Sequence, residues 1–201
     1  MSNCCCNIVA IEGPEADLLS LRNHINAVCS LPLNTGYSHL ALLLLRLGYS
    51  KDDLKDLALA EDFTGGKAVI ENGILTLSDE SANTFKGDGW EKVHAKYSKC
   101  SIYFCAEEFG CDIFETNDTS GHIFGSKYCL DWADDEAGSG EVEYFDDDNA
   151  LIEYVRANFD PSVNTLEQAK AALDVFEEDD TSDRFASLHE IEYNTEYKLL
   201  A

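Results

Sequence analysis

Three apolar runs in the middle of the chain show a pattern that is typical of β-strands. They span residues 101–105, 111–115 and 123–132, are rich in aromatic and β-branched residues and contain no proline. Gly110 and the turn-rich stretch 117–121 separate them. The pattern predicts three successive strands, and therefore an antiparallel meander at the centre of the fold.

Apolar residues at strand or helix spacing predict most of the other elements. Residues 5–12 form a nearly continuous apolar run before the turn at Gly13 and Pro14, which predicts a first strand. The pair Asn72-Gly73 supplies the positive φ angles of a tight hairpin turn. The stretch 78–89 is polar and turn-rich. We expect strands at 68–77 (a hairpin) and 141–145 (an edge strand), and helices at 14–28, 38–47, 51–57, 90–97, 146–159 and 165–177.

This order of elements predicts a two-layer α+β fold with helices on one face of a mostly antiparallel sheet. A ferredoxin-like sandwich is the natural candidate, because it combines strands, a hairpin and two main helices in this order. We expect one domain over residues 1–160, with a helical insertion at about 30–62, followed by a C-terminal helical extension over 161–201. The last segment, 185–200, fits either a helix or a terminal strand.

The charge balance changes which partners are expected. The chain has 39 acidic and 14 basic residues, a net charge of −25, which repels nucleic-acid backbones and anionic lipids. Direct nucleic-acid or membrane binding is therefore not expected, whereas basic surfaces of other proteins, or divalent cations, are the expected partners. No apolar run approaches the roughly 20 residues that span a bilayer, and the first residues lack the features of a signal peptide. We expect a cytoplasmic protein.

Carboxylates are concentrated between Gly110 and Tyr154, where 13 acidic residues face the single basic residue Lys127. Because many alternate with aromatic strand residues, we expect several of them in fixed rows on a sheet face. Such rows repel one another, and a cationic partner would explain their presence. The expected partner-binding residues are Asp112, Glu115, Asp131, Asp134, Asp135, Glu136, Glu141, Glu143, Asp146, Asp147 and Asp148.

Residues for catalysis or metal binding are few. Cys4, Cys5 and Cys6 are adjacent, and neighbouring strand residues point to opposite faces, so they cannot close one tetrahedral zinc site. We expect the cysteines to be free thiols, and no cofactor or metal. A hydrolase would have to use Glu107, Glu108, His94 or His122. Adjacent strand residues diverge, so the two glutamates favour a solvated turn instead.

Three segments resemble the Api92-like family of phage and mobile-element proteins, which carry a YubB-type ferredoxin-like domain. Residues 3–14 are similar to the family's Asn-x-Cys-x-Asn start, strand and glycine turn, although Cys5 departs from it in detail. Residues 90–103 resemble its Trp-led helix, Lys-Tyr turn and strand. Residues 107–110 resemble its Glu-Pro-Gly turn, with Phe109 in place of proline.

The resemblance covers about two thirds of the chain and leaves out the insertion and the last 40 or so residues. It implies a ferredoxin-like fold and a bacterial prophage, plasmid or conjugative element as the setting. It implies no reaction and no catalytic residues.

Three functions stay open on the sequence. The first is a non-catalytic acidic interaction protein, with a DNA mimic that blocks a host defence nuclease as its specific form. The second is an acidic accessory domain whose charge maintains solubility, and the third, the least favoured, is a small hydrolase. The edge strand 141–145 also offers a surface for a homodimer, although its charges oppose simple edge pairing.

Overall fold

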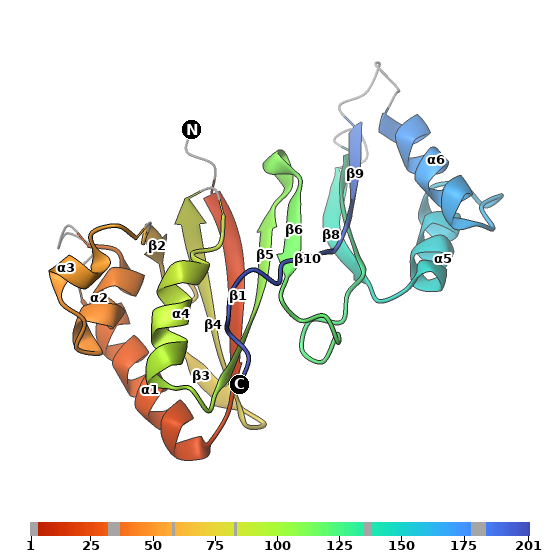
Figure 1. The fold of residues 1–201 in the computed structure, drawn as a ribbon. Coiled ribbons are helices and arrows are strands. Elements are labelled where there is room, and N and C mark those ends of the chain that lie inside the picture. The colour runs from red at the N-terminus through yellow and green to blue at the C-terminus, as the bar shows by residue number, and fades with distance from the viewer. Residues whose placement is uncertain (1–3, 32–36, 58, 83, 135–137, 178–183) are drawn as a thin grey trace. The chain divides into compact units, whose positions relative to one another are not determined.

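The first strand, β1 (Cys4–Glu12), is a central strand of a seven-stranded sheet in the computed structural model, which describes residues 4–31, 37–57, 59–82, 84–134, 138–177 and 184–201. It pairs antiparallel with β4 (Ile74–Ala82) on one side and with β5 (Ser101–Glu108) on the other. The order of the strands is β10-β6-β5-β1-β4-β2, and β3 also pairs with β4 (Figure 1). The remaining strands of this sheet are β2 (Glu61–Asp62), β3 (Val69–Glu71), β6 (Ile113–Thr116) and β10 (Glu192–Tyr193).

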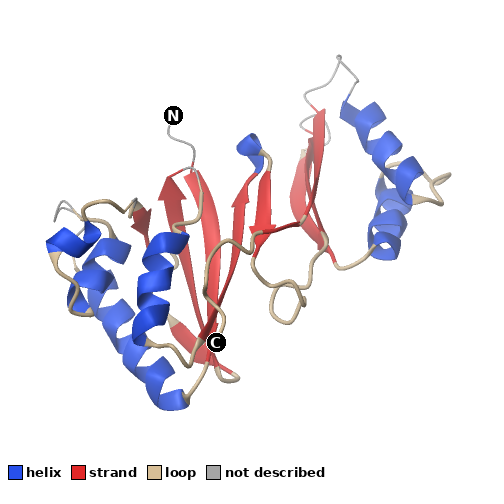
Figure 2. Ribbon diagram, in the orientation of Figure 1, coloured by secondary structure: helices blue, strands red, loops and turns tan. Residues whose placement is uncertain are grey.

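Helices α1 (Glu15–Cys29), α2 (His39–Arg46) and α4 (Gly87–Lys96) lie on one side of this sheet (Figure 2). They share one hydrophobic core with it. On β1, alternate residues enter the core, because successive strand side chains point to opposite faces. Along the chain, the elements follow in the order strand, helix, insertion, hairpin, helix and strand. In the sheet, the paired strands lie in the order β5-β1-β4-β3. Core residues include Val9, Ile11, Leu21, Ile25, Leu43, Leu75, Trp90 and Phe104.

Local signals place several elements as expected. Ser38 caps α2, and Ser50 forms a capping box with Asp53 at the start of the short helix α3 (Lys51–Leu54). Asn72 and Gly73 have φ angles of 52° and 84°, which closes the tight turn between β3 and β4. The predicted hairpin is therefore confirmed, two short helices lie within residues 30–62, and the described chain has an α+β architecture.

A second, three-stranded sheet has the order β8-β7-β9 and is antiparallel throughout. Its strands are β7 (Tyr128–Asp134), β8 (Ser139–Phe145) and β9 (Arg184–Glu190). Helices α5 (Asp148–Asn158) and α6 (Leu166–Glu177) pack on it through a separate core that includes Tyr128, Leu130, Leu151, Val155 and Leu173. Each sheet therefore has its own hydrophobic core.

The prediction of a single three-stranded meander is wrong. β5 and β6 form a hairpin in the large sheet, but the third run contributes β7 to the small sheet. Asn117 ends the pairing: its side chain accepts from the Phe104 N–H at 2.9 Å and donates to the Ile102 carbonyl at 2.8 Å. These bonds take up backbone groups of β5 that a longer β6 would otherwise pair with.

The chain divides into a larger unit, residues 1–119 with 193–201, and a smaller unit, residues 120–192. This differs from the expected division at residue 160. The expected helical extension supplies α6 and β9 to the smaller unit, because β9 pairs with β7 along its whole length. The last residues return to the larger unit, where the Ile102 N–H donates to the Leu199 carbonyl at 2.7 Å.

Strand β4 is longer than predicted. Residues up to Ala82 continue the strand, although 78–89 was expected to be a polar turn region. Asp79 and Ser81 point into the protein and are buried, with 1% and 3% of their surface exposed. Buried and exposed positions alternate along the whole of β4, but polar residues occupy the buried positions of its second half. A hydrophobicity pattern therefore does not detect this part of the strand.

Candidate functional site

The smaller unit carries most of the negative charge of the chain. Its 73 residues contain 20 acidic and 4 basic side chains, which gives −16, whereas the larger unit has 19 acidic and 10 basic side chains, which gives −9. Well over half of the net charge thus belongs to little more than a third of the residues.

All four basic side chains of the smaller unit have partners inside it. Lys127 Nζ lies 2.7 Å from Asp148 Oδ1, Lys170 Nζ lies 3.5 Å from Glu190 Oε2, and Arg184 Nε lies 2.9 Å from Asp134 Oδ2. Arg156 donates to the Val163 carbonyl at 2.7 Å. The basic side chains of the unit are thus already engaged, and its acidic side chains outnumber them by 16.

Glu141 and Glu143 lie on the edge strand β8, on the same face of the sheet. They pair in register with Trp132 and Leu130 of β7, whose side chains pack against α5 and α6. Glu141 is exposed, and the Tyr154 hydroxyl donates to its Oε1 at 2.8 Å. Partial burial and this hydrogen bond raise the pKa of Tyr154 to about 12, so the tyrosine remains a proton donor that holds the carboxylate in place.

Asp146 and Asp147 connect β8 to α5, and Asp148 is the first residue of that helix. Asp147 is the N-cap of α5 and accepts from the Ala150 N–H at 2.9 Å, and Ser126 donates to Asp146 at 3.3 Å. Asp146 and Asp147 are exposed. Hydrogen bonds from Lys127 and Tyr128 lower the pKa of Asp148, which keeps this carboxylate ionised. These three residues come together as the sequence predicts.

Asp131 lies on the opposite face of the small sheet. It pairs in register with Val142 on β8 and Ser187 on β9, and it is half-buried. Two exposed apolar side chains flank it: Val142 is 42% and Phe185 is 41% exposed. Asp131, Glu141 and Glu143 therefore do not form rows on one face, because the register places Asp131 on one side of the sheet and the two glutamates on the other.

Asp134 is a structural residue of the small sheet. It is buried, and its carboxylate pairs with Arg184 between the facing ends of β7 and β9. The Arg184 guanidinium also lies 5.5 Å from the ring centre of Phe176 on α6. Asp134 is thus held inside the unit and is not offered to a partner.

Replacing Asp134 by asparagine is expected to destabilise the protein by about 1–3 kcal/mol. Breaking a fully buried ion pair costs about 3–5 kcal/mol, and the partial exposure of Arg184 reduces that cost. Urea unfolding measures the effect, with Asp131→Asn on the same strand as the control. Equal stability of the two variants would contradict the structural role of Asp134.

The remaining predicted residues belong to the larger unit or lie outside the described ranges. Asp112 and Glu115 belong to the larger unit: Asp112 is exposed before β6, and Glu115 on β6 accepts from Asn194 Nδ2 at 3.0 Å. Asp135 and Glu136 lie outside the described residues. The structure therefore gathers five of the predicted carboxylates, hereafter the acidic surface, near the edge strand and the turn that follows it: Glu141, Glu143, Asp146, Asp147 and Asp148.

The predicted hydrolase residues lie on separate elements or on opposite faces of one strand. Glu107 and Glu108 are successive residues of β5, whose side chains point to opposite faces. His94 lies on α4 of the larger unit, whereas His122 belongs to the smaller unit. In the ranges that the structure describes, no three histidine, cysteine, aspartate or glutamate residues come close enough to hold a metal ion.

The cysteine run follows the expected alternation, since Cys4 and Cys6 are exposed and Cys5 is buried. Partial burial and the Glu80 carboxylate raise the pKa of Cys4 to about 11. Burial raises the pKa of Cys5 to about 12. These thiols therefore remain protonated and weakly nucleophilic near neutral pH.

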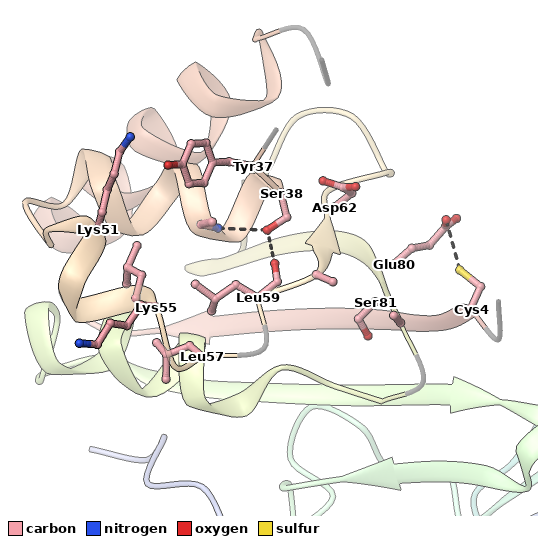
Figure 3. Close-up of a pocket in the computed structure, with 14 residues that line it drawn as sticks. Cys4, Tyr37, Ser38, Lys51, Lys55, Leu57, Leu59, Asp62, Glu80 and Ser81 are labelled. Carbon is pink, nitrogen blue, oxygen red and sulfur yellow. Dashed lines mark hydrogen bonds between the residues drawn. The ribbon is translucent and has the colours of Figure 1, made fainter. Parts of the chain in front are cut away.

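The structure also contains features of the larger unit that sequence reasoning missed. A pocket of about 790 Å³ lies between the insertion and the sheet edge, lined on one side by Tyr37, Lys51 and Lys55 and on the other by Asp62 and Glu80 (Figure 3). Beside it, two carboxyl groups are fully buried, those of Glu61 and Asp79. Glu61 lies on a strand of two residues, and Asp79 lies in the polar half of β4, so no hydrophobic periodicity could have indicated either of them.

None of the helices in the described ranges is long and apolar enough to cross a membrane. Comparisons with protein-family models, with curated proteins and with solved structures find no match to this chain.

Proposed function

We propose that this protein is a non-catalytic interaction protein whose acidic surface binds the basic surface of a DNA- or RNA-handling protein. One observation carries the proposal: the smaller unit has a net charge of −16, and each of its basic side chains already has a partner within the unit. A cationic partner would relieve the repulsion among the remaining carboxylates and would be attracted at long range.

The geometry of the acidic surface supports a rigid docking site. Glu141 is held by Tyr154, Asp147 by the first turn of α5, and Asp148 by Lys127 and Tyr128. Ordered side chains lose less conformational entropy when a partner binds. Fixed carboxylates on a strand and a helix N-terminus can take the place of backbone phosphates in a basic groove, so a DNA mimic that blocks a defence nuclease is the specific form of the proposal.

The larger unit is proposed to be a ferredoxin-like scaffold. Its antiparallel strands lie in the order β5-β1-β4-β3, with α1 after the first and α4 after the third strand of this set. This is the arrangement of a split β-α-β pair on either side of a hairpin. It supports the resemblance to Api92-like proteins and, with it, a mobile element in a bacterial host as the setting.

An affinity pull-down from a bacterial lysate tests the proposed function. The immobilised full-length chain is expected to retain a DNA- or RNA-handling protein, to lose it steeply as salt rises, and to release it when duplex DNA is added as a competitor. Release by DNA separates a mimic from any other electrostatic contact. Recovery of no nucleic-acid-handling protein, or only of salt-resistant ones, would overturn the proposal in favour of an accessory domain whose charge maintains solubility.

A further inference from the structure

Two buried carboxyl groups meet where the insertion joins the large sheet. Glu61 is on β2, is 0% exposed, and lies directly opposite Ser81 of β4. Asp79, two residues before Ser81 on the same strand face, is 1% exposed. The two carboxyls are within hydrogen-bonding reach of each other. Neither takes part in the proposed docking function.

Each carboxyl has one satisfied oxygen and one without a partner. The Trp90 indole N–H donates to Glu61 Oε1 at 2.7 Å, and Asn7 Nδ2 donates to Asp79 Oδ1 at 2.5 Å. Within the described ranges, Oε2 of Glu61 and Oδ2 of Asp79 are buried and have no hydrogen-bond partner. Two carboxylate oxygens can bond to each other only through a proton, so a proton between the carboxyls would satisfy both.

Among the described residues, no lysine, arginine or histidine forms an ion pair with either carboxyl. The Glu61–Asp79 pair faces Cys5 and Asn7 on β1 and Ser81 on β4. The negative charge of Glu80, on the opposite face of β4, raises the pKa of Asp79. The Trp90 indole N–H on α4 and the Lys86 backbone N–H, just before that helix, are hydrogen-bond donors to Glu61. Lys86 Nζ itself bonds to the Ala82 carbonyl, and His39 on α2 accepts from the Phe63 N–H.

We propose that Glu61 and Asp79 share a proton and form a latch that holds β2, and with it the end of the insertion, against the edge of β4. β2 has only two residues, so its backbone pairing alone is a weak attachment. β2 and the neighbouring residues of the insertion form one wall of the pocket in Figure 3. The proton therefore couples pH to the closure of this pocket.

The sign of the pH effect follows from burial. Burial raises the pKa of Asp79 to about 7. Burial, together with the negative charge of Asp79, raises the pKa of Glu61 well above its ordinary value. The closed form thus keeps at least one proton that an opened, hydrated form releases above about pH 5. The closed form is favoured at low pH and loses stability as pH rises through the folded-state values, so opening becomes at least about tenfold more favourable per pH unit between about pH 5 and 7.

Hydrogen exchange of residues 59–64 tests the latch in the full-length chain. Protection factors, which remove the intrinsic effect of pH, are expected to fall by at least about tenfold per unit between about pH 5 and 7. Glu61→Gln supplies the bridging hydrogen permanently and is expected to lose most of this dependence. Glu80→Gln, the same change on the exposed face, is expected to keep it. Equal pH dependence in the two variants would overturn the proposal.

A second measurement needs no change in the pair. The Trp90 indole N–H bonds directly to Glu61, so its NMR resonance is expected to shift with the ionisation of the pair between about pH 6 and 8. A Trp132→Phe variant identifies which of the two indole signals belongs to Trp90. An indole signal that does not move over this range would overturn the latch even if a variant of the pair failed to fold.

Discussion

Binding to the basic partner is expected to fall by about 100-fold when four carboxylates of the acidic surface are neutralised together. The variant carries Glu141→Gln, Glu143→Gln, Asp146→Asn and Asp147→Asn. Each exposed ion pair is worth up to about 1 kcal/mol, and about 1.4 kcal/mol is a tenfold change in affinity. The four together therefore account for about 2–4 kcal/mol. Isothermal titration with the partner recovered from the lysate, repeated at several salt concentrations, measures both the loss and its salt dependence.

These replacements are chosen to leave the fold intact. Asparagine is as good an N-cap as aspartate at position 147, and glutamine can still accept the hydrogen bond that Tyr154 donates to Glu141. A matched control removes the same number of charges from exposed positions of the larger unit, with Asp56→Asn, Glu71→Gln, Asp88→Asn and Glu196→Gln. An equal loss of binding in both variants would show that only total charge matters, which contradicts a docking site on the smaller unit.

Replacing Trp90 by alanine is expected to lower the free energy of unfolding by about 3–5 kcal/mol. Trp90 is 0% exposed, lies 6.2 Å from the ring centre of Phe63, and belongs to the core that the helices share with the large sheet. Its loss leaves a large cavity and also removes the donor to Glu61 Oε1. Urea unfolding followed by far-UV circular dichroism measures the change.

Two further variants separate these causes. Trp90→Phe keeps most of the apolar ring but removes the N–H, so it is expected to cost about 1–3 kcal/mol through the unpaired Glu61 oxygen. Val69→Ala, at a side chain that is 47% exposed on β3, is expected to change stability by less than about 1 kcal/mol. A Trp90→Ala variant as stable as Val69→Ala would contradict the central packing role of Trp90.

Much of the fold could be predicted because its signals act over a few residues. The helix caps at Ser38 and Ser50 and the turn at Asn72-Gly73 depend on local hydrogen bonds and backbone angles. The alternation of Cys4, Cys5 and Cys6 follows from strand geometry alone. The prediction of the third meander strand was wrong for the opposite reason: its position depends on pairing with residues 184–190, and each pair is at least 50 positions apart in the sequence.

The candidate site likewise combines features that depend on local sequence with features that depend on distant contacts. The sequence alone predicted an acidic cluster around Asp146–Asp148 and an edge strand at 141–145, because composition and alternation are local properties. It could not separate Asp134, which is buried against Arg184, from the exposed Glu141 and Asp147. The sequence does not show whether a given carboxylate is exposed to solvent or buried in an ion pair with an arginine.

The sequence by itself determined the charge, the α+β class, the capped helices and the β3–β4 hairpin, since each follows from composition or from neighbours along the chain. Only the tertiary structure decided that the chain builds two sheets, that its last residues return to the first of them, and that Glu61 and Asp79 face each other in the core. These features rest on contacts between distant residues, and a buried polar pair such as this one leaves no trace in the hydrophobic pattern.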